Sequence, residues 1–292
     1  MSDLLSKTRE ICRLFEIKPA RSKGQNFLIN EKIYDDMVNA ADLQADDLVL
    51  EVGPGLGFLT TKLASKVKKV VAVELDDRLA AYLQMGVDAQ ETTNIEIING
   101  DILKFDLADY LSEHGLAGKK YKIVANLPYN ISSIFLRRFL SLQNKPELVV
   151  LMLQKEVAER IVATPPDMNL LAVSVQYYAA PEIMRIVKAG NFWPEPEVDS
   201  AIIKIKITDD YKLSINADLV IDQEKKFFQI VRIGFSAKRK MLKNNLAAGL
   251  KITPKIVEDL LVKTGFNPKA RAEDLSLQDW RKLFAALKSF VV

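Results

Sequence analysis

Short apolar runs alternate with helix-sized amphipathic segments from about residue 30 to residue 160, and this alternation strongly constrains the fold. We interpret five apolar runs as buried strands, at residues 47–53, 67–75, 95–100, 121–126 and 147–154. Continuous apolar strands separated by helices form parallel sheets that are covered on both faces. The alternation therefore predicts an α/β fold with a mostly parallel sheet. The run "SAIIKIKI" at 200–207 alternates residue by residue, which is typical of an antiparallel edge strand.

Beyond about residue 210 the strand patterns stop. Four helices are expected there, at residues 223–235, 238–250, 253–263 and 276–290. Thr253-Pro254 and the pair Ser276 and Asp279 are helix-start signals, and Gly265 is a stop signal. The predicted organisation is an α/β domain at residues 1–210 followed by a small all-α domain at residues 211–292.

Charge is distributed unevenly along the chain, although the formal net charge is only +3. Residues 211–292 contain 16 Lys/Arg and 8 Asp/Glu, whereas residues 1–210 contain 25 Lys/Arg and 30 Asp/Glu. From Lys225 to Val257 the chain has nine cations and no acid. Because a solvated helix usually mixes both signs, this excess favours a surface that faces a polyanion, with nucleic acid as the first candidate.

Several classes of protein are disfavoured by composition. No apolar run approaches the roughly 18–20 residues of a membrane-spanning helix. The charged N-terminus lacks the apolar core of a signal peptide, so we expect a cytoplasmic protein. A single cysteine, Cys12, and a single histidine, His114, leave no internal disulfide and no cysteine- or histidine-based metal site. We therefore expect neither a membrane nor a metal partner.

A glycine-rich turn, "EVGPGLG" at residues 51–57, follows the first predicted strand. Gly53, Gly55 and Gly57 allow a tight turn and a close approach of the backbone to a ligand. The spacing Gly-x-Gly-x-Gly departs from the Gly-x-Gly-x-x-Gly of dinucleotide-binding folds. Alone, this motif is also compatible with a tight strand–helix connection that binds nothing.

Two acids end the next two strands. Glu74 is placed to accept hydrogen bonds from the ribose hydroxyls of a nucleoside. Asp101 is placed to accept from an adenine amine. Each acid could instead be a helix N-cap, but three matched strand ends together predict a nucleoside site. Acids without a phosphate-binding lysine suit a cationic cofactor, which favours S-adenosylmethionine over NAD.

The fourth strand ends at the same edge in Asn126-Leu127-Pro128-Tyr129. The Asn126 side-chain oxygen and the Leu127 carbonyl can accept the two hydrogens of an amine, while Pro128 fixes the backbone. Tyr129 offers a ring on which a base can stack. Methylation of a pyrimidine carbon would need a cysteine nucleophile, and Cys12 is far from any strand end. The motif therefore predicts methylation of an exocyclic amine, with a proline-terminated strand and a core tyrosine as the alternative.

A proline-stiffened loop, "NFWPEPEVDSA" at residues 191–201, leads into the last strand. Phe192 in this loop could form the second side of an aromatic clamp around the base. A hydrophobic anchor is an equally good interpretation of this stretch.

Taken together, "KGQNFLIN", "EVGPGLG", "NLPYNIS", the F-x-P-x-P-x-VDSA pattern and "FSAKRKMLKNNL" resemble the small-subunit rRNA adenine dimethyltransferases, the KsgA/RsmA family. The resemblance covers nearly the whole chain in order. It implies a Rossmann-like S-adenosylmethionine-dependent methyltransferase domain followed by a small helical domain. It also implies dimethylation of the N6 amines of two adjacent adenosines near the 3′ end of 16S rRNA during biogenesis of the small ribosomal subunit. We expect a monomer.

The resemblance also assigns residues. Asn26 and Leu28 are implied to close over the cofactor. The complete expected cofactor site is Asn26, Leu28, Gly53, Gly55, Gly57, Glu74, Asp101, Ile102 and Asn126. The expected catalytic residues around the target adenine are Asn126, Leu127, Pro128, Tyr129 and Phe192. The expected RNA-binding residues are Arg21, Lys23, Lys238, Arg239, Lys240 and Lys243.

This chain departs from the family at two places, and three other functions remain open. Lys238-Arg239-Lys240-Met241 stands where the family usually has two arginines, a lysine and a threonine, and Glu195 stands where a further proline is common. The first alternative is a 23S rRNA adenine methyltransferase of the macrolide-resistance type, which shares the catalytic motifs but lacks the longer basic segment. The second is a ribosome-assembly factor that acts mainly by binding. A DNA amine methyltransferase is disfavoured, because those enzymes often have aspartate where this chain has Asn126.

Overall fold

The computed structural model describes residues 4–19, 25–116, 118–208 and 217–291. The chain divides into two compact units, Met1–Ala158 with Ala180–Ile207, and Glu159–Ala179 with Thr208–Val292. The boundary that we predicted between residues 210 and 211 lies outside the described residues. Glu159–Ala179 belongs to the second unit, although the sequence pattern placed these residues in the α/β domain.

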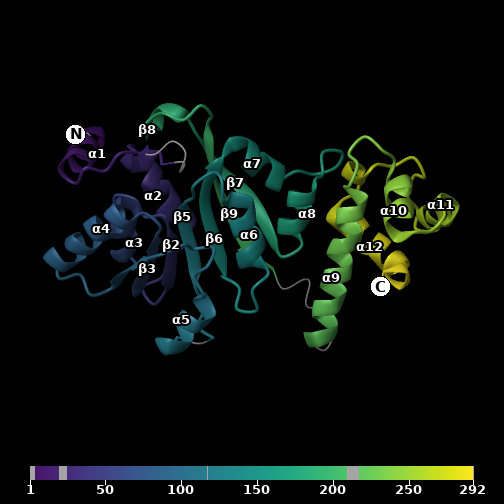
Figure 1. Cartoon of the computed structure of the whole chain (residues 1–292), viewed down its shortest axis with the longest axis horizontal. Coiled ribbons are helices and arrows are strands. Elements are labelled where there is room, and N and C mark those ends of the chain that lie inside the picture. Colours follow the sequence, from purple (N-terminus) through teal and green to yellow (C-terminus); the bar gives the residue numbers. More distant parts are fainter. Residues whose placement is uncertain (1–3, 20–24, 117, 209–216, 292) are drawn as a thin grey trace. The chain divides into compact units, whose positions relative to one another are not determined.

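A seven-stranded sheet with the order β4-β3-β2-β5-β6-β9-β7 forms the centre of the first unit (Figure 1). Its strands are β2 (Leu48–Val52), β3 (Lys69–Glu74), β4 (Ile95–Asn99), β5 (Lys122–Asn126), β6 (Leu148–Gln154), β7 (Ala179–Val187) and β9 (Ser200–Ile207). The strands from β4 to β6 pair in parallel, whereas β9 is antiparallel to β6. Every residue of β2 is buried, as expected for a strand covered on both faces. The predicted α/β fold with a mostly parallel sheet is confirmed.

The strand order reverses at β2. The chain runs from β2 outward to β3 and β4, and then returns to the other side of β2 as β5. In open parallel sheets, ligands bind beyond the carboxyl ends of the strands at such a reversal. Gly53, Glu74 and Asn126 stand at or directly after the ends of β2, β3 and β5. The topology therefore brings three of the predicted motifs to one edge of the sheet.

Two helices, α2 (Glu31–Ala40) and α3 (Phe58–Ala64), pack together against the sheet. Their apolar side chains form one buried cluster with residues of the sheet, including Ile33 of α2, Leu63 of α3 and Met152 of β6. Both helices are among the helix-sized amphipathic segments expected between the strands, and their inward residues are buried.

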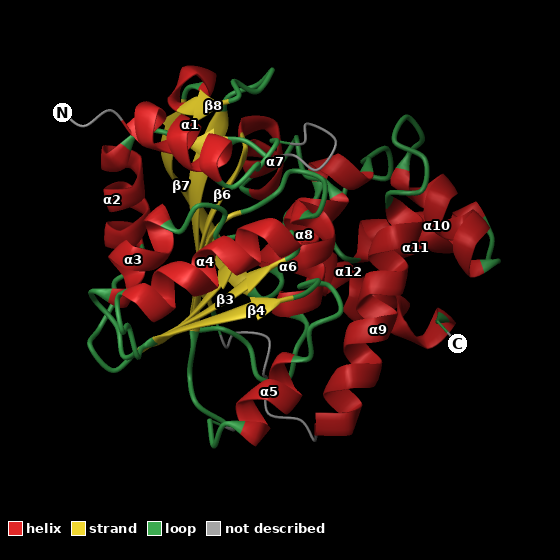
Figure 2. Ribbon diagram, turned by 60° about the vertical axis from the view of Figure 1, so that its left-hand side comes forward, coloured by secondary structure: helices red, strands yellow, loops and turns green. Residues whose placement is uncertain are grey.

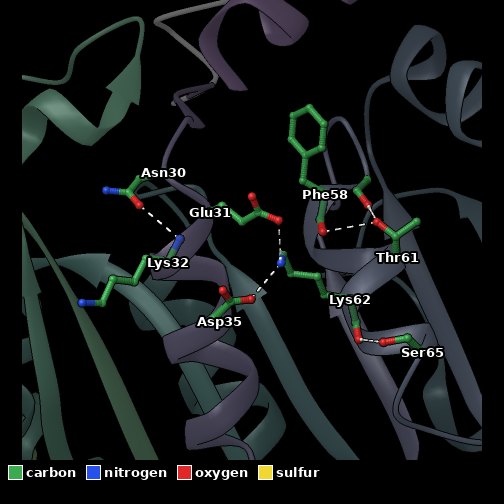
Figure 3. A network of polar contacts seen from close by, with 9 residues as sticks. Asn30, Glu31, Lys32, Asp35, Phe58, Thr61, Lys62 and Ser65 are labelled. Atoms are coloured by element: carbon green, nitrogen blue, oxygen red, sulfur yellow. Dashed lines mark hydrogen bonds and ion pairs between the residues drawn. The ribbon is translucent and has the colours of Figure 1, made fainter. Parts of the chain in front are cut away.

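Polar contacts fix the outer sides of the same helices (Figure 3). The Asn30 side chain caps α2 by accepting from the Lys32 N–H at 3.1 Å. The Lys62 ammonium of α3 pairs with Glu31 at 3.1 Å and with Asp35 at 2.7 Å on α2. These exposed pairs contribute little free energy, but they hold the helix that follows the glycine turn against its neighbour.

Figure 2 shows helices and strands by type around this sheet. The remaining elements of the first unit are α1 (Leu4–Leu14), α4 (Asp77–Ala89), α5 (Leu107–Glu113), α6 (Ser132–Leu140), the start of α7 (Lys155–Ile161), β1 (Phe27–Leu28), β8 (Phe192–Trp193) and the short 3₁₀ helix Ala189–Asn191. Strands β1 and β8 form a separate two-stranded antiparallel sheet, in which Phe27 pairs with Trp193 and Leu28 with Phe192. This small sheet joins the "GQNFL" segment to the proline-stiffened loop.

One strand assignment from the sequence is wrong. Strand β9 was predicted as the edge of the sheet, but β7 lies outside it and forms the edge. The sequence "AAPEIMRIV" of β7 carries Pro181 and two charged residues, and its burial alternates along the strand. Proline and charge are features that edge strands tolerate, because one side of the strand has no partner to receive hydrogen bonds.

The second unit is helical. Its main helices are α8 (Leu170–Gln176), α9 (Ala217–Gly234), α10 (Leu242–Leu250), α11 (Pro254–Lys263) and α12 (Leu277–Leu287), with 3₁₀ helices at Ala272–Asp274 and Lys288–Phe290. Trp280 is fully buried in their shared core. Thr253 caps α11, and Ser276 and Asp279 form the predicted capping box of α12. Within the residues that the structure describes, no helix is both long and apolar enough to cross a bilayer.

The helix predicted at residues 238–250 begins only at Leu242, and residues 236–241 form a turn. The cause is Asn245, whose buried side-chain amide donates to the Gly234 carbonyl at 2.7 Å and to the Ala237 carbonyl at 3.1 Å. The first bond satisfies the carbonyl of the last residue of α9, the second satisfies a carbonyl of the turn, and together they direct the chain away from a continuous helix. The cations Lys238, Arg239 and Lys240 are therefore on an exposed turn between two helices.

Candidate active site

The glycine turn after β2 requires glycine at three places. Gly53, Gly55 and Gly57 have φ values of 63°, 61° and 77°, in the left-handed region that side chains with a Cβ disfavour. Gly53 and Gly55 line a cavity at the carboxyl edge of the sheet. Gly57 does not, and a Cβ there would lie 2.7 Å from a methyl carbon of Leu83. Its glycine is explained by packing between α3 and α4, and its contact with a cofactor stays a prediction.

The cavity contains most of the predicted site. Residues of the predicted site that line it are Asn26, Leu28, Gly53, Gly55, Glu74, Asn126, Leu127, Pro128 and Tyr129. They come from β1 and from the ends of β2, β3 and β5, so residues up to 103 positions apart in the sequence share one cavity. Gln25 donates to Asp76 at 3.5 Å across its rim.

Glu74 holds the glycine turn and the start of α4 together. Its Oε2 accepts from the Gly55 N–H at 3.1 Å, and its Oε1 accepts from the Asp76 N–H at 2.9 Å. Burial raises the pKa of Glu74, and the two backbone N–H donors oppose that rise. Each carboxylate oxygen can accept a second hydrogen bond, so the side chain can take a diol while it keeps the turn in place.

Glu51 also lines the cavity, and the sequence interpretation missed it. Its side chain is 1% exposed, and among the described residues its Oε2 has no hydrogen-bond partner. Burial raises the pKa of Glu51 to about 8, the neighbouring Thr60 hydroxyl opposes that rise, and the nearby Glu74 carboxylate adds to it. A buried acceptor without a partner costs free energy, and a ligand that donates a hydrogen bond there removes that cost. The signal in the sequence was a lone charge inside the apolar strand "LVLEV".

Glu51→Gln should change how stability depends on pH. The native carboxyl is protonated up to about pH 8, whereas the unfolded one ionises near its ordinary pKa of 4.5. Between pH 4.5 and about pH 8 the unfolded state therefore binds fewer protons than the native state. The free energy of unfolding of the wild type should fall as the pH rises through this range. One pKa unit corresponds to about 1.4 kcal/mol, so the fall should reach a few kcal/mol. Denaturant unfolding without ligand measures it, and parallel pH profiles for wild type and variant would contradict the burial argument.

The segment after β5 is held from three sides. The Leu127 N–H donates to the Met152 carbonyl at 3.2 Å, which extends the pairing of β5 with β6 by one residue. A Cβ on Gly53 would lie 3.7 Å from Pro128 Cδ, so the proline ring packs against the glycine turn. The hydroxyl groups of Tyr129 and the buried Ser200 are 2.8 Å apart and hydrogen-bonded. Asn126 and Tyr129 are only partly buried, and they share the cavity with Glu74.

Besides Gly57, three other predicted residues do not line the cavity. The Asp101 side chain accepts from the Leu103 N–H at 2.9 Å at the start of a turn. The next helix, α5, is capped by Asp106, so the N-cap alternative for Asp101 is wrong. Ile102 is buried at 5% exposure. Phe192 is 3% exposed, packs in the core cluster of α2 and α3, and pairs with Leu28. This placement fits the hydrophobic-anchor interpretation of Phe192, and an aromatic clamp stays a prediction.

The predicted RNA-binding cations differ in their surroundings. Lys238, Arg239 and Lys240 are exposed on the turn before α10. Lys243 is mostly buried and pairs with Glu258 of α11 at 2.8 Å. Arg21 and Lys23 lie outside the described residues.

Comparison with known proteins gives a consistent result. A family model described as "Ribosomal RNA adenine dimethylase" matches residues 18–289. The chain is 42% identical to the ribosomal RNA small subunit methyltransferase A of Dehalococcoides mccartyi over 96% of this chain and 92% of that relative. It is 37% identical to the protein of the same name from Alkaliphilus metalliredigens over 95% of both chains.

Solved structures agree over most of the chain. A dimethyladenosine transferase from Plasmodium falciparum superimposes with a TM-score of 0.76 at 27% identity and covers 90% of this chain and 98% of its own. The 23S rRNA methyltransferase ErmE superimposes with a TM-score of 0.71 at 25% identity, over 90% of this chain and all of its own.

Proposed function

The chain belongs to the ribosomal RNA adenine dimethylase family, and from this premise we propose that it dimethylates the N6 amines of two adjacent adenosines near the 3′ end of 16S rRNA. The proposed methyl donor is S-adenosylmethionine, and the proposed partner is the small ribosomal subunit during its biogenesis. We further propose that the protein works in the cytoplasm as a monomer.

One observation carries this proposal. The cavity that contains the glycine turn and Glu74 also contains Asn126, Leu127 and Tyr129. The residues proposed for the cofactor and those proposed for a planar amine therefore share one cavity at one edge of the sheet. This is the arrangement that direct transfer between a cofactor and a base requires, because the reacting atoms must be held in contact.

The residues of the cavity suit S-adenosylmethionine. Gly53 and Gly55 leave room for a ligand near the backbone, and Glu74 can accept from ribose hydroxyls. Among the described residues, Glu51 supplies a buried acceptor without a partner, which suits an ammonium or another donor. When bound, S-adenosylmethionine supplies an electrophilic methyl group on a cationic sulfur. A bound cation favours the ionised form of the two buried carboxyls, Glu51 and Glu74, whereas a phosphate opposes it, and no lysine is found among the described residues of the lining.

The chain's own contribution to the reaction is positioning. Asn126 and the Leu127 carbonyl would accept the two hydrogens of the target amine and direct its lone pair toward the cofactor. Tyr129, held by Ser200, would present one face of its ring to the base. Before this, the adenosine has to leave its stack in the RNA. In the same proposal, the exposed cations of the second unit bind phosphates and dock the RNA.

Glu74→Ala should weaken S-adenosylmethionine binding by roughly 1.5–3 kcal/mol, the usual value of hydrogen bonds to a charged group. The loss should exceed that of one ribose contact, because Glu74 also holds the Gly55 and Asp76 N–H groups. Calorimetric titration measures it, with Asp77→Ala as the matched control, since Asp77 is an exposed acid three residues away. A folded Glu74→Ala protein with unchanged affinity would remove Glu74 from the cofactor site.

A direct experiment tests the reaction. Small and large ribosomal subunits from cells lacking this protein are incubated, in separate reactions, with the purified protein and methyl-labelled S-adenosylmethionine. We expect label only in 16S rRNA, N6,N6-dimethyladenosine in the nuclease digest, and a primer-extension stop at paired adenosines near the 3′ end. Label in 23S rRNA instead would support the macrolide-resistance type of enzyme. Binding to subunits without any label would support an assembly factor that acts by binding alone.

The small-subunit reaction is favoured over the 23S reaction by the relatives. The proteins from Dehalococcoides mccartyi and Alkaliphilus metalliredigens that carry the small-subunit name are 42% and 37% identical to this chain. The 23S rRNA enzyme ErmE is 25% identical.

A further inference from the structure

Helix α1 precedes the segment that the family model matches, which begins at residue 18. It nevertheless has a defined inner face. Thr8 and Cys12 are buried, Ile11 and Phe15 are partly buried, and Leu14 on the opposite side is 62% exposed. This helical spacing is typical of an amphipathic helix that packs on a neighbouring surface.

The C-terminal end of α1 is fixed in place. Glu16 adopts a left-handed conformation with φ of 52°, and the Ile17 N–H donates to the Cys12 carbonyl at 2.9 Å. This is the Schellman arrangement, in which the residue after the left-handed one packs back on the last turn. Ile17 is 5% exposed, and the Arg78 guanidinium of α4 donates to the Glu16 carbonyl at 2.7 Å. The helix end is thereby attached to the helix that follows Glu74.

The inner face of α1 packs directly behind the cofactor cavity. Cys12 and Ile17 form one buried cluster with Phe27, Leu56 and Leu79. All three of these partners line the cavity. A Cβ on Gly55 would lie 3.5 Å from Phe27 Cε1, so the buried cluster extends to the glycine turn. Helix α1 therefore packs on the outer side of the three residues that line this part of the cavity.

The same cluster reaches the proline-stiffened loop. Trp193 packs against the cluster, and the Arg9 guanidinium of α1 lies 5.8 Å from the centre of its ring. Trp193 also pairs with Phe27 in the sheet of β1 and β8. Figures 1 and 2 both show α1 beside β8. Helix α1 thus contacts both strands of the small sheet that borders the cavity.

We propose that the inner side of Leu4–Ile17, with Cys12 and Ile17, is a positioning element of the cofactor site, which holds Phe27, Leu56 and Leu79 in the arrangement that binds the nucleoside half of S-adenosylmethionine. The inference rests on the proposed cofactor. The proposal extends the binding site to a segment that precedes residue 18, where the match to the family model begins. Ile17 is the central residue of this segment. The nucleoside half is the relevant one because Leu79 stands on the helix that begins directly after Glu74.

The test compares two substitutions in the full chain. Ile17→Ala removes buried contacts behind Phe27, whereas Leu14→Ala removes an exposed side chain of the same segment. Calorimetry with S-adenosylmethionine should show a dissociation constant raised about fivefold or more for Ile17→Ala, the lower range for coupled sites. Leu14→Ala should match the wild type. Urea unfolding of both variants separates binding from stability.

A purely structural role predicts a different result. In that case Ile17→Ala would lose unfolding free energy while its dissociation constant stayed at the wild-type value, and the proposal would be overturned. A wild-type protein that does not bind S-adenosylmethionine would overturn the proposed function as well. Equal constants for wild type and Ile17→Ala overturn only this inference.

A second measurement uses the unmodified protein, in case Ile17→Ala does not fold. Coupling is reciprocal, so S-adenosylmethionine must stabilise α1 if α1 strengthens its binding. Hydrogen exchange of residues 4–17 should therefore slow severalfold when S-adenosylmethionine is added. Slower exchange at the glycine turn with no change in α1 would overturn the proposal.

Discussion

Asn126→Ala should leave a folded protein that binds RNA normally but methylates about 100-fold more slowly or worse, the loss expected when a reacting group is misplaced. The side chain stands at the end of β5, in the cavity shared with Glu74 and the glycine turn. In the proposed mechanism, removing its amide removes an acceptor for the target amine without changing the phosphate contacts that dominate RNA affinity. The rate is measured as single-turnover methylation of small subunits at saturating S-adenosylmethionine.

The control for this variant is Asn130→Ala, because Asn130 is an exposed amide four residues further along the same segment. It should methylate at the wild-type rate. Tyr129→Ala should lose at least about tenfold, since stacking on one ring contributes roughly 1–3 kcal/mol. Tyr129→Phe keeps the ring, loses only the bond to Ser200, and should retain most activity. Normal methylation by Asn126→Ala would mean that this strand end is not the active site.

Local patterns in the sequence were sufficient for the part of the site that parallel strands create. The apolar runs located β2, β3 and β5, and the residues that follow such strands must meet at one edge of the sheet. Gly53, Glu74 and Asn126 could therefore be grouped from the sequence alone, and the cavity contains all three.

Features that depend on distant pairing could not be predicted. Phe192 had two equal interpretations, because its burial comes from pairing with Leu28, 164 residues earlier in the chain. The edge strand β7 was missed because an edge strand needs only a weak alternation of apolar residues. Glu51 was overlooked because its significance comes from the lack of a partner among its described neighbours, which the strand pattern does not reveal.

The basic segment shows how one side chain decides local structure. Residues 238–250 have a composition suited to a continuous helix, but the buried amide of Asn245 donates to the Gly234 carbonyl at the end of α9 and to the Ala237 carbonyl in the turn. The chain therefore turns, and Lys238, Arg239 and Lys240 project from a connection between helices. A turn presents adjacent cations together, whereas a helix would spread them around its axis by about 100° per residue. Adjacent exposed cations suit the closely spaced phosphates of an RNA backbone.

Replacing Lys238, Arg239 and Lys240 together by glutamine should therefore weaken RNA binding strongly and leave cofactor binding intact. Each phosphate contact that is lost should lower the slope of log affinity against log salt by about one unit, so the slope should fall by about three. Lys243 is kept, because it pairs with Glu258 at 2.8 Å and lowers the pKa of that carboxyl. Neutralising Lys243 would mix a loss of RNA contacts with the loss of an internal ion pair.

The matched control replaces Lys263, Lys269 and Lys288, which are exposed lysines elsewhere in the helical unit. Both triple variants lose the same charge, so a general electrostatic attraction predicts equal changes in slope. A docking surface at the turn predicts a large change only for the first variant. Since non-specific attraction depends on total charge while contacts depend on position, equal slopes in the two variants would show that this turn does not hold the RNA. Calorimetry with S-adenosylmethionine on both variants should give the wild-type constant, because none of the six residues lines the cavity.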